Sequence, residues 1–296
     1  MTVQVPSGRS LAFRGSNSSC ERVPGMSVQL PLQDTGRSRS ALPSRRETLS
    51  ILAALVAVVS LAWVYLFVST THMEAAASAH AMMGMSEVPW TAAHLALTFL
   101  MWAVMMVAMM LPSTSPMILT YAAVNRRVTP SQSPALSVAF FASGYVLVWL
   151  GFSIGATLLQ WALEHVALLS PALVAASPLL GGSLLIIAGL YQWAPLKEFC
   201  LKHCQMPLAF IAHHWRAGRS GALQMGAEHG VYCVGCCWAL MLLLFVGGVM
   251  NLLWVAAIAV FVLLEKLGAR TRVARWISGA GLIAGGGAVM SGFSGF

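Results

Sequence analysis

The chain has very little charge, and acidic residues are scarcest. Asp, Glu, Lys and Arg together make up 9% of the 296 residues, and only nine residues are acidic. Hydrophobic residues account for 58% of the chain, and the mean hydropathy is +0.77. Soluble globular domains of this length are rarely so apolar, so the composition excludes that class and predicts a membrane protein.

Other absences narrow the function. The chain has no P-loop, no GxSxG and no HExxH motif, so no enzyme class is predicted. Six cysteines in 296 residues are too few for a disulfide scaffold. The net charge of +8 is spread over loops and the N-terminal segment. The basic residues are therefore expected to set the orientation of the chain in the membrane, and no nucleic-acid partner is predicted.

Long uncharged stretches predict an all-α fold, a polytopic membrane bundle of about seven transmembrane helices within residues 47–296. At ~1.5 Å per residue each stretch can cross ~30 Å of hydrocarbon or comes close to it. The run 231–264 is uncharged and too long for one span, so we expect a hairpin that turns near Gly247, Gly248 and Asn251. The expected spans lie near 49–68, 90–111, 136–160, 172–191, 231–247, 249–264 and 276–293.

Charge outside the spans predicts the orientation. Residues 1–46 are polar and rich in Ser, Gly, Pro and Arg, which predicts a disordered basic tail. Lys and Arg then recur in every second loop, whereas the other loops carry Glu74, Glu87 and Glu164. By the positive-inside rule the N-terminus is cytoplasmic and the C-terminus lies outside.

Two cysteines lie in a loop on the predicted cytoplasmic side. Pro195 suits the first turn of a short helix, and Pro207 would end it. On that helix Cys200 and Cys204 are four residues apart and share a face with Lys197. A lysine beside thiols favours thiolate, the form that binds metals.

Three more cysteines follow a histidine downstream. His229, Cys233 and Cys237 recur every four residues, which makes a stripe if the fifth spanning helix begins early. Cys233 and Cys236 form a CxxC pair, and Gly235 also permits a non-helical knuckle. The alternatives are a soft-metal site, with Cu(I) favoured, a structural zinc site, and plain packing of Cys236 and Cys237.

Methionine and histidine gather on the predicted outer side and in the second span. Met101, Met105 and Met109 share one helix face, with His94 seven residues before Met101. The loop expected after the first span contains His72, His80 and several methionines. Thioethers and imidazoles suit copper capture and transfer. The alternatives are ordinary methionine packing and a hydrogen-bonded His94.

Two further features concern helix ends. Pro112 and Pro116 are expected to end the second helix and begin the basic loop after it. Glu265 and Lys266 close the sixth span, where an interfacial charged pair is expected.

Three motifs carry a family resemblance. They are MWAVMMVAMMLPS at 101–113, YQWAPLKEFCLKHCQMP at 191–207 and HGVYCVGCCWALM at 229–241. With them the chain resembles DUF2182, a bacterial family of predicted metal-binding integral membrane proteins, some of which carry copper-chaperone labels. The resemblance implies a metal set of Cys200, Cys204, Cys233, Cys236 and Cys237.

We therefore expect a multi-pass protein of the bacterial inner membrane that binds Cu(I), rather than Zn, for metal handling or transfer. Its partners would be the lipid bilayer and a copper chaperone or another membrane protein. The alternatives are a structural zinc–thiolate assembly protein and a membrane thiol–disulfide oxidoreductase. The expected metal ligands are the five cysteines and His229, with Met101, Met105, Met109, His94, His72 and His80 as weaker candidates.

Overall fold

The described part of the chain has an all-α fold, as expected. The computed structural model describes residues 45–82, 90–129, 134–169, 173–268 and 272–292, with the backbone alone for 73–82. These residues form ten helices and no sheet, apart from one isolated bridge between Leu169 and Ala175. Most of the predicted tail lies outside them. The helices are α1 (Arg45–Met82), α2 (Ala92–Val128), α3 (Pro134–His165), α4 (Pro178–Gln192), α5 (Pro195–Gln205), α6 (Pro207–His214), α7 (Gly218–Leu242), α8 (Leu244–Gly247), α9 (Leu252–Leu267) and α10 (Arg272–Met290).

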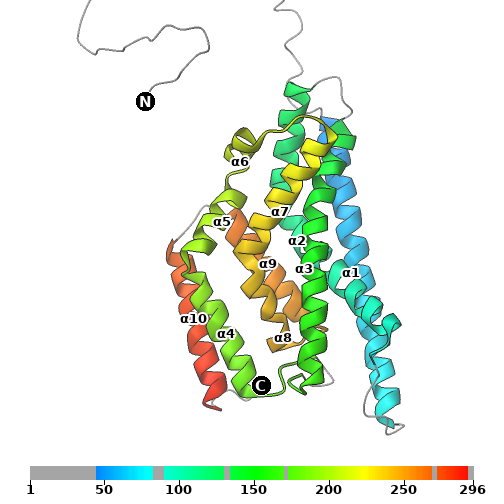
Figure 1. Ribbon diagram of the computed structural model, residues 1–296, viewed down its shortest axis with the longest axis vertical. Coiled ribbons are helices and arrows are strands. Elements are labelled where there is room, and N and C mark those ends of the chain that lie inside the picture. Colours follow the sequence, from blue (N-terminus) through cyan, green and yellow to red (C-terminus); the bar gives the residue numbers. More distant parts are fainter. Residues whose placement is uncertain (1–44, 83–89, 130–133, 170–172, 269–271, 293–296) are drawn as a thin grey trace, which may run out of the picture. The chain divides into compact units, whose positions relative to one another are not determined.

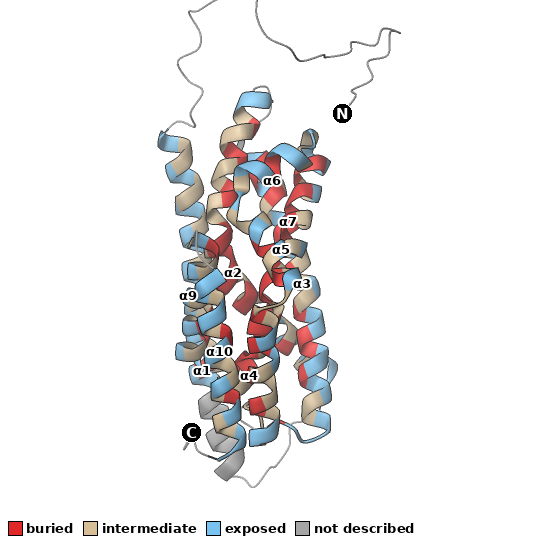
Figure 2. Cartoon of the chain, turned by 90° about the vertical axis from the view of Figure 1, so that its left-hand side faces the viewer, coloured by how far each residue is buried: buried red, intermediate tan, exposed pale blue. Residues whose placement is uncertain are grey.

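Helices α2, α3 and α7 form the centre of the bundle. Helix α3 packs along α7 and α2, α1 covers α2, and α4 pairs with α10 at the opposite flank (Figure 1). In their most apolar stretches, α2 and α7 are 56% buried, whereas α1 and α10 are 11% buried. Figure 2 shows the same contrast between buried inner helices and exposed outer ones. The residues of α2 and α7 therefore form the core.

Glycines allow the central helices to approach closely. A side chain at Gly226 of α7 would collide with the Phe141 carbonyl of α3, and one at Gly144 would collide with the Leu223 carbonyl. Small residues at such contacts let helix backbones pack closely, as membrane helices often do. This close approach fixes the face that α7 presents to the bundle.

Helix α2 continues through Pro112 and Pro116, so the expectation that these prolines end it was wrong. Each proline leaves a carbonyl one turn earlier without its amide partner. The Ser115 hydroxyl donates to the Pro112 carbonyl at 2.8 Å, which compensates for the missing amide of Pro116. Ser and Thr side chains and neighbouring helices commonly rescue prolines inside membrane helices.

Helix α1 also runs farther than expected. It extends to Met82, so residues 71–82, expected to be loop, are helical. This segment is rich in Ala, with Met and Glu among its other residues, and all three are strong helix formers. The remaining loop residues, 83–89, lie outside the described part.

The expected hairpin is present between α7 and α9. Helix α7 is followed by the short α8, and the chain turns at Gly248, whose φ of 93° favours glycine. The Asn251 side chain then caps α9 by accepting a hydrogen bond from the Trp254 amide at 3.2 Å. The glycine and asparagine therefore form the turn as predicted.

Five helical segments are long and apolar enough to cross a bilayer: 45–72 of α1, α2, α3, α7 with α8, and α10. A sixth crossing results if α4 and α5, bent by 66°, form one broken span. Helix α9 has 16 residues. That gives a length of about 24 Å, less than the ~30 Å of hydrocarbon. Each expected span coincides with a helix, and crossing by α4 and α9 stays a prediction.

Candidate metal centre

Helix α7 places a stripe of histidine and cysteine in the bundle centre. It begins at Gly218, well before the expected span, so His229, Cys233 and Cys237 lie on successive turns of one helix. All three are buried, with exposed fractions of 2%, 0% and 1%. The early helix start that the stripe required is therefore present, and the alternative knuckle at Gly235 is not formed.

The Cys233 sulfur contacts polar groups of two other helices. The Lys266 ammonium of α9 lies 2.9 Å from it, and the Tyr145 hydroxyl of α3 lies 3.1 Å from it. The same ammonium donates to the Ser113 hydroxyl of α2 at 2.7 Å. A buried ammonium needs a partner that can carry negative charge, and the Cys233 thiol is such a group.

The other two thiols of α7 turn back onto its backbone. Cys236 and Cys237 both donate to the Cys233 carbonyl, at 3.1 Å and 2.9 Å. The Cys237 sulfur also lies 4.0 Å from the Met110 sulfur of α2. These thiols are therefore adjacent to Cys233 and to a thioether, although each has a protein partner.

Helix α5 brings its own thiols to α7. Cys204 packs against the core that contains Cys233 and Cys236. Cys200 packs on Gly235, where a β-carbon would lie 2.7 Å from its sulfur. The Tyr191 hydroxyl, at the end of α4, donates to the Gly235 carbonyl. The absence of a side chain at Gly235 thus lets α5 dock on α7.

These contacts define a thiol cluster of Cys200, Cys204, Cys233, Cys236 and Cys237. Among the described residues, however, no three His, Cys, Asp or Glu side chains are already arranged to hold a metal ion. The sulfurs are close, but Cys233 points to Lys266 and Tyr145, and two other thiols point to the backbone. The metal assignment of these residues stays a prediction.

His229 lies one turn before Cys233 in an aromatic surround. Its Nε2 is 3.1 Å from the Thr114 hydroxyl of α2, and its ring stacks on Tyr145 with centroids 5.6 Å apart. Its Nδ1 is buried and has no hydrogen-bond partner among the described residues. Neutral imidazole binds metals through either nitrogen, so this nitrogen is a candidate ligand.

The methionines of α2 lie inside the bundle. Met101, Met105 and Met109 are buried, with exposed fractions of 7%, 1% and 1%, and Met106 and Met110 are fully buried. Because Met110 touches Cys237, this methionine row ends at the thiol cluster. Both packing and a transfer role are consistent with these positions.

The weaker histidine candidates do not reach the thiol cluster. His94 is half-buried in the first turn of α2, and its ring lies edge-on to Trp90 at 4.5 Å. His72 is exposed on α1. Neither contacts a cysteine in the described part of the chain. The side chain of His80 lies outside it.

Sequence reasoning assigned the wrong lysine to the thiols. Lys197 is buried and binds the Glu265 carboxylate at 2.8 Å, whereas Lys266 reaches Cys233. Glu265 and Lys266 therefore do not form the expected interfacial pair. Consecutive residues of a helix project about 100° apart, and this could have shown that the two side chains face different neighbours. Nothing in the sequence alone indicated Tyr145 or Ser113.

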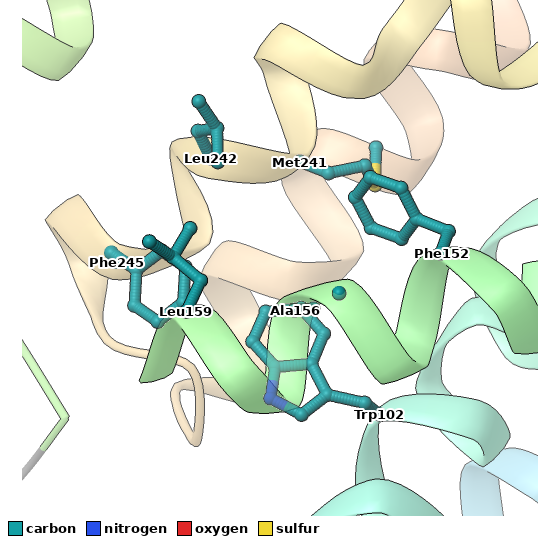
Figure 3. A pocket seen from close by; sticks show the side chains of 8 residues that line it. Trp102, Phe152, Ala156, Leu159, Met241, Leu242 and Phe245 are labelled. Atoms are coloured by element: carbon teal, nitrogen blue, oxygen red, sulfur yellow. The ribbon is translucent and has the colours of Figure 1, made fainter. Parts of the chain in front are cut away.

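An apolar cavity of about 160 Å³ lies away from the cluster, among α2, α3, α7 and α8. Figure 3 shows Trp102, Phe152 and Met241 on its walls. The Trp102 indole N–H donates to the Gln160 side chain at 2.8 Å, so the one polar atom of that ring already has a partner. Apart from the Met241 thioether, the lining offers no ligand for a soft metal.

Comparisons with known proteins place the chain in a family. No curated protein and no solved structure matches it. A family model does match over residues 99–289, which include the methionine row, the thiol cluster and Lys266. A relation to copper is thereby supported, whereas the DUF2182 resemblance stays a prediction. The chain belongs to the PpoB2 family, whose description is copper chaperone.

Proposed function

We propose that this protein is a multi-pass membrane protein that binds Cu(I) at the thiol cluster and passes it on. The observation that carries the proposal is the meeting of the α5 and α7 thiols in the buried centre of the bundle. The copper-chaperone description of the family and the length and apolarity of the helices support it.

The chemistry of the cluster favours Cu(I) as cargo. Thiolate and thioether sulfurs are soft ligands, and they select Cu(I) and Zn over Mg or Ca. A methionine row that ends at a thiol cluster favours copper over zinc, because thioethers bind Zn weakly. Cu(I) would compete with the Lys266 ammonium for the Cys233 sulfur, so the empty site keeps its buried charges paired.

The direction of transfer follows from the expected topology. Histidines and methionines near His72 and His80 would capture copper outside, and the methionines of α2 would lead it inward. Two cysteines of the thiol cluster belong to α5, in a loop that carries Lys and Arg, and we place this loop in the cytoplasm of a bacterial inner membrane. A copper chaperone or another membrane protein would receive the ion there.

The experiment is a Cu(I) titration of purified, reduced protein against a chromogenic Cu(I) chelator. We expect tight binding that weakens by more than about tenfold in Cys204→Ser and in Cys233→Ser, since loss of even an outer-shell partner costs about 10–100-fold. Cys20→Ser is the matched control, because Cys20 is the one cysteine outside the cluster.

Other results would favour the rivals. Tightly bound Zn that Cu(I) does not displace would support a structural zinc–thiolate protein. Unchanged Cu(I) affinity in both variants, with catalysed thiol oxidation that requires Cys233 and Cys236, would support a thiol–disulfide oxidoreductase. Either result would overturn the copper proposal.

A further inference from the structure

A pocket with charged side chains on its walls lies outside the thiol cluster. Its volume is about 350 Å³, and α5, α9 and the first two turns of α10 line it. Cationic side chains on its walls are Lys202, Arg272 and Arg275. None of these residues takes part in the thiol cluster, so the copper proposal leaves the pocket unexplained.

Positive charges outnumber negative charges on the walls of the pocket. Glu198 is shared, because it binds Lys202 at 2.9 Å and Arg275 at 3.0 Å. The second carboxylate of the lining, Glu265, is already neutralised by Lys197 at 2.8 Å.

The third cation, Arg272, has no counter-ion among the described residues. It is exposed and has no ion-pair partner in the part of the chain that the structure describes. The lining therefore has three cations and a single available carboxylate, Glu198, which binds two of them. An anionic ligand would compensate the excess positive charge.

The remaining walls are apolar. Phe261 and Leu264 of α9 and Leu201 of α5 line the same pocket as the cations. Leu264 is 62% exposed, so an apolar surface continues outward from the pocket. A free inorganic anion would gain nothing from these walls, whereas an amphipathic anion would use both kinds of surface.

Aromatic residues place the pocket at the membrane interface. Trp276 follows Arg272 by one helical turn, is 53% exposed and stacks on Trp193 at 4.7 Å. Tryptophan gathers at the depth of lipid headgroups, where its ring meets both apolar and polar surroundings. The cations of the pocket therefore lie at the depth of lipid phosphates.

We propose that this pocket binds the headgroup of an anionic phospholipid. Its phosphate would lie among Arg272, Arg275 and Lys202, and its acyl chains would run along Phe261 and Leu264. Basic pockets between membrane helices on the cytoplasmic side bind such headgroups. Arg272 carries the specificity, because it is the cation without a protein partner among the described residues.

The test compares Arg272→Gln with Arg219→Gln, which changes an exposed arginine in the first turn of α7, outside the pocket. Purified protein in neutral detergent is titrated with phosphatidylglycerol or phosphatidylcholine, and the thermal unfolding midpoint is measured. We expect phosphatidylglycerol to raise the midpoint more than phosphatidylcholine in the wild type and in Arg219→Gln. Arg272→Gln should lose this difference while its midpoint without added lipid stays unchanged.

Further arms make the result decisive. Lys202→Gln should also lose the lipid difference, and it replaces Arg272→Gln if that variant does not fold. Glycerol phosphate supplies the headgroup without acyl chains and should have no effect. An equal response to both lipids, or a full response in the two pocket variants, would overturn the proposal. A response to glycerol phosphate that matches phosphatidylglycerol would show a soluble phosphate site instead.

Discussion

The sulfur of Cys233 joins three helices through two neighbours, the Tyr145 hydroxyl of α3 and the Lys266 ammonium of α9. Lys266 is 7% exposed and cannot reach water easily. Removing one member of a buried ion pair leaves the other charge uncompensated, whereas replacing both members with apolar groups is often harmless. The contribution of Lys266 to the free energy of unfolding should therefore depend on Cys233.

This dependence can be measured with a double-mutant cycle. Cys233→Ala alone should destabilise the protein by about 3–5 kcal/mol, because it leaves a buried ammonium without its sulfur. Adding Lys266→Met, which removes the charge and keeps the chain length, should restore most of the lost stability. Chemical unfolding in detergent gives the free energies. If Cys233→Ala and the double variant are equally unstable, the two side chains do not form a charged pair.

At the scale of elements, the docking of α5 on α7 creates the cluster. Proline at the first position of α5 and again at the start of α6 sets the limits of the short helix, as the sequence predicted. The glycine between the α7 cysteines then admits Cys200. The limits of α5 could be anticipated from local rules, whereas the contact of Cys200 with Gly235 could not.

The contacts of the cluster with α2, α3 and α9 could not be anticipated in this way. Lys266 and Ser113 are 153 residues apart in sequence, and Tyr145 and Cys233 are 88 apart. Helical periodicity says which residues share a face, but it does not say which faces meet. Local rules also misjudged Pro116, because the rescue of a proline depends on nearby hydroxyls that propensity does not count.

The methionine row of α2 allows a test at the element scale. Met101, Met105 and Met109 are replaced together with Leu, which keeps volume and apolarity but removes the thioether sulfurs. If the row conducts copper to the cluster, cellular copper accumulation should fall while the protein level stays constant. Met117→Leu is the control, since Met117 is buried on the same helix but lies beyond the cluster. Unchanged copper accumulation in the triple variant would identify these methionines as packing residues.

For the whole molecule, the number of membrane crossings depends on α9 and on the bent pair of α4 and α5. Burial supports a bundle whose outer helices face lipid, since Leu61 of α1, Ile277 of α10 and Leu253 of α9 are 69%, 69% and 82% exposed. Helix α9 is short, but it is a single helix with the hairpin turn at its start and Glu265 and Lys266 at its end. Local thinning of the bilayer could accommodate such a length at modest cost.

The basic loops decide which topology to expect. If every predicted span crosses, the basic residues all lie on one side of the membrane. They are Arg45 and Arg46 before the first span, Arg126 and Arg127 after α2, and the cations of α5 and α10. A reporter fused after Gly218, between the fourth and fifth spans, should then be cytoplasmic, and one fused after Phe296 should lie outside. An alkaline phosphatase and green fluorescent protein pair reports the two sides in opposite ways. Fusions on the same side would mean that α9 or α10 does not cross, and the copper path from outside to the thiol cluster would need another route.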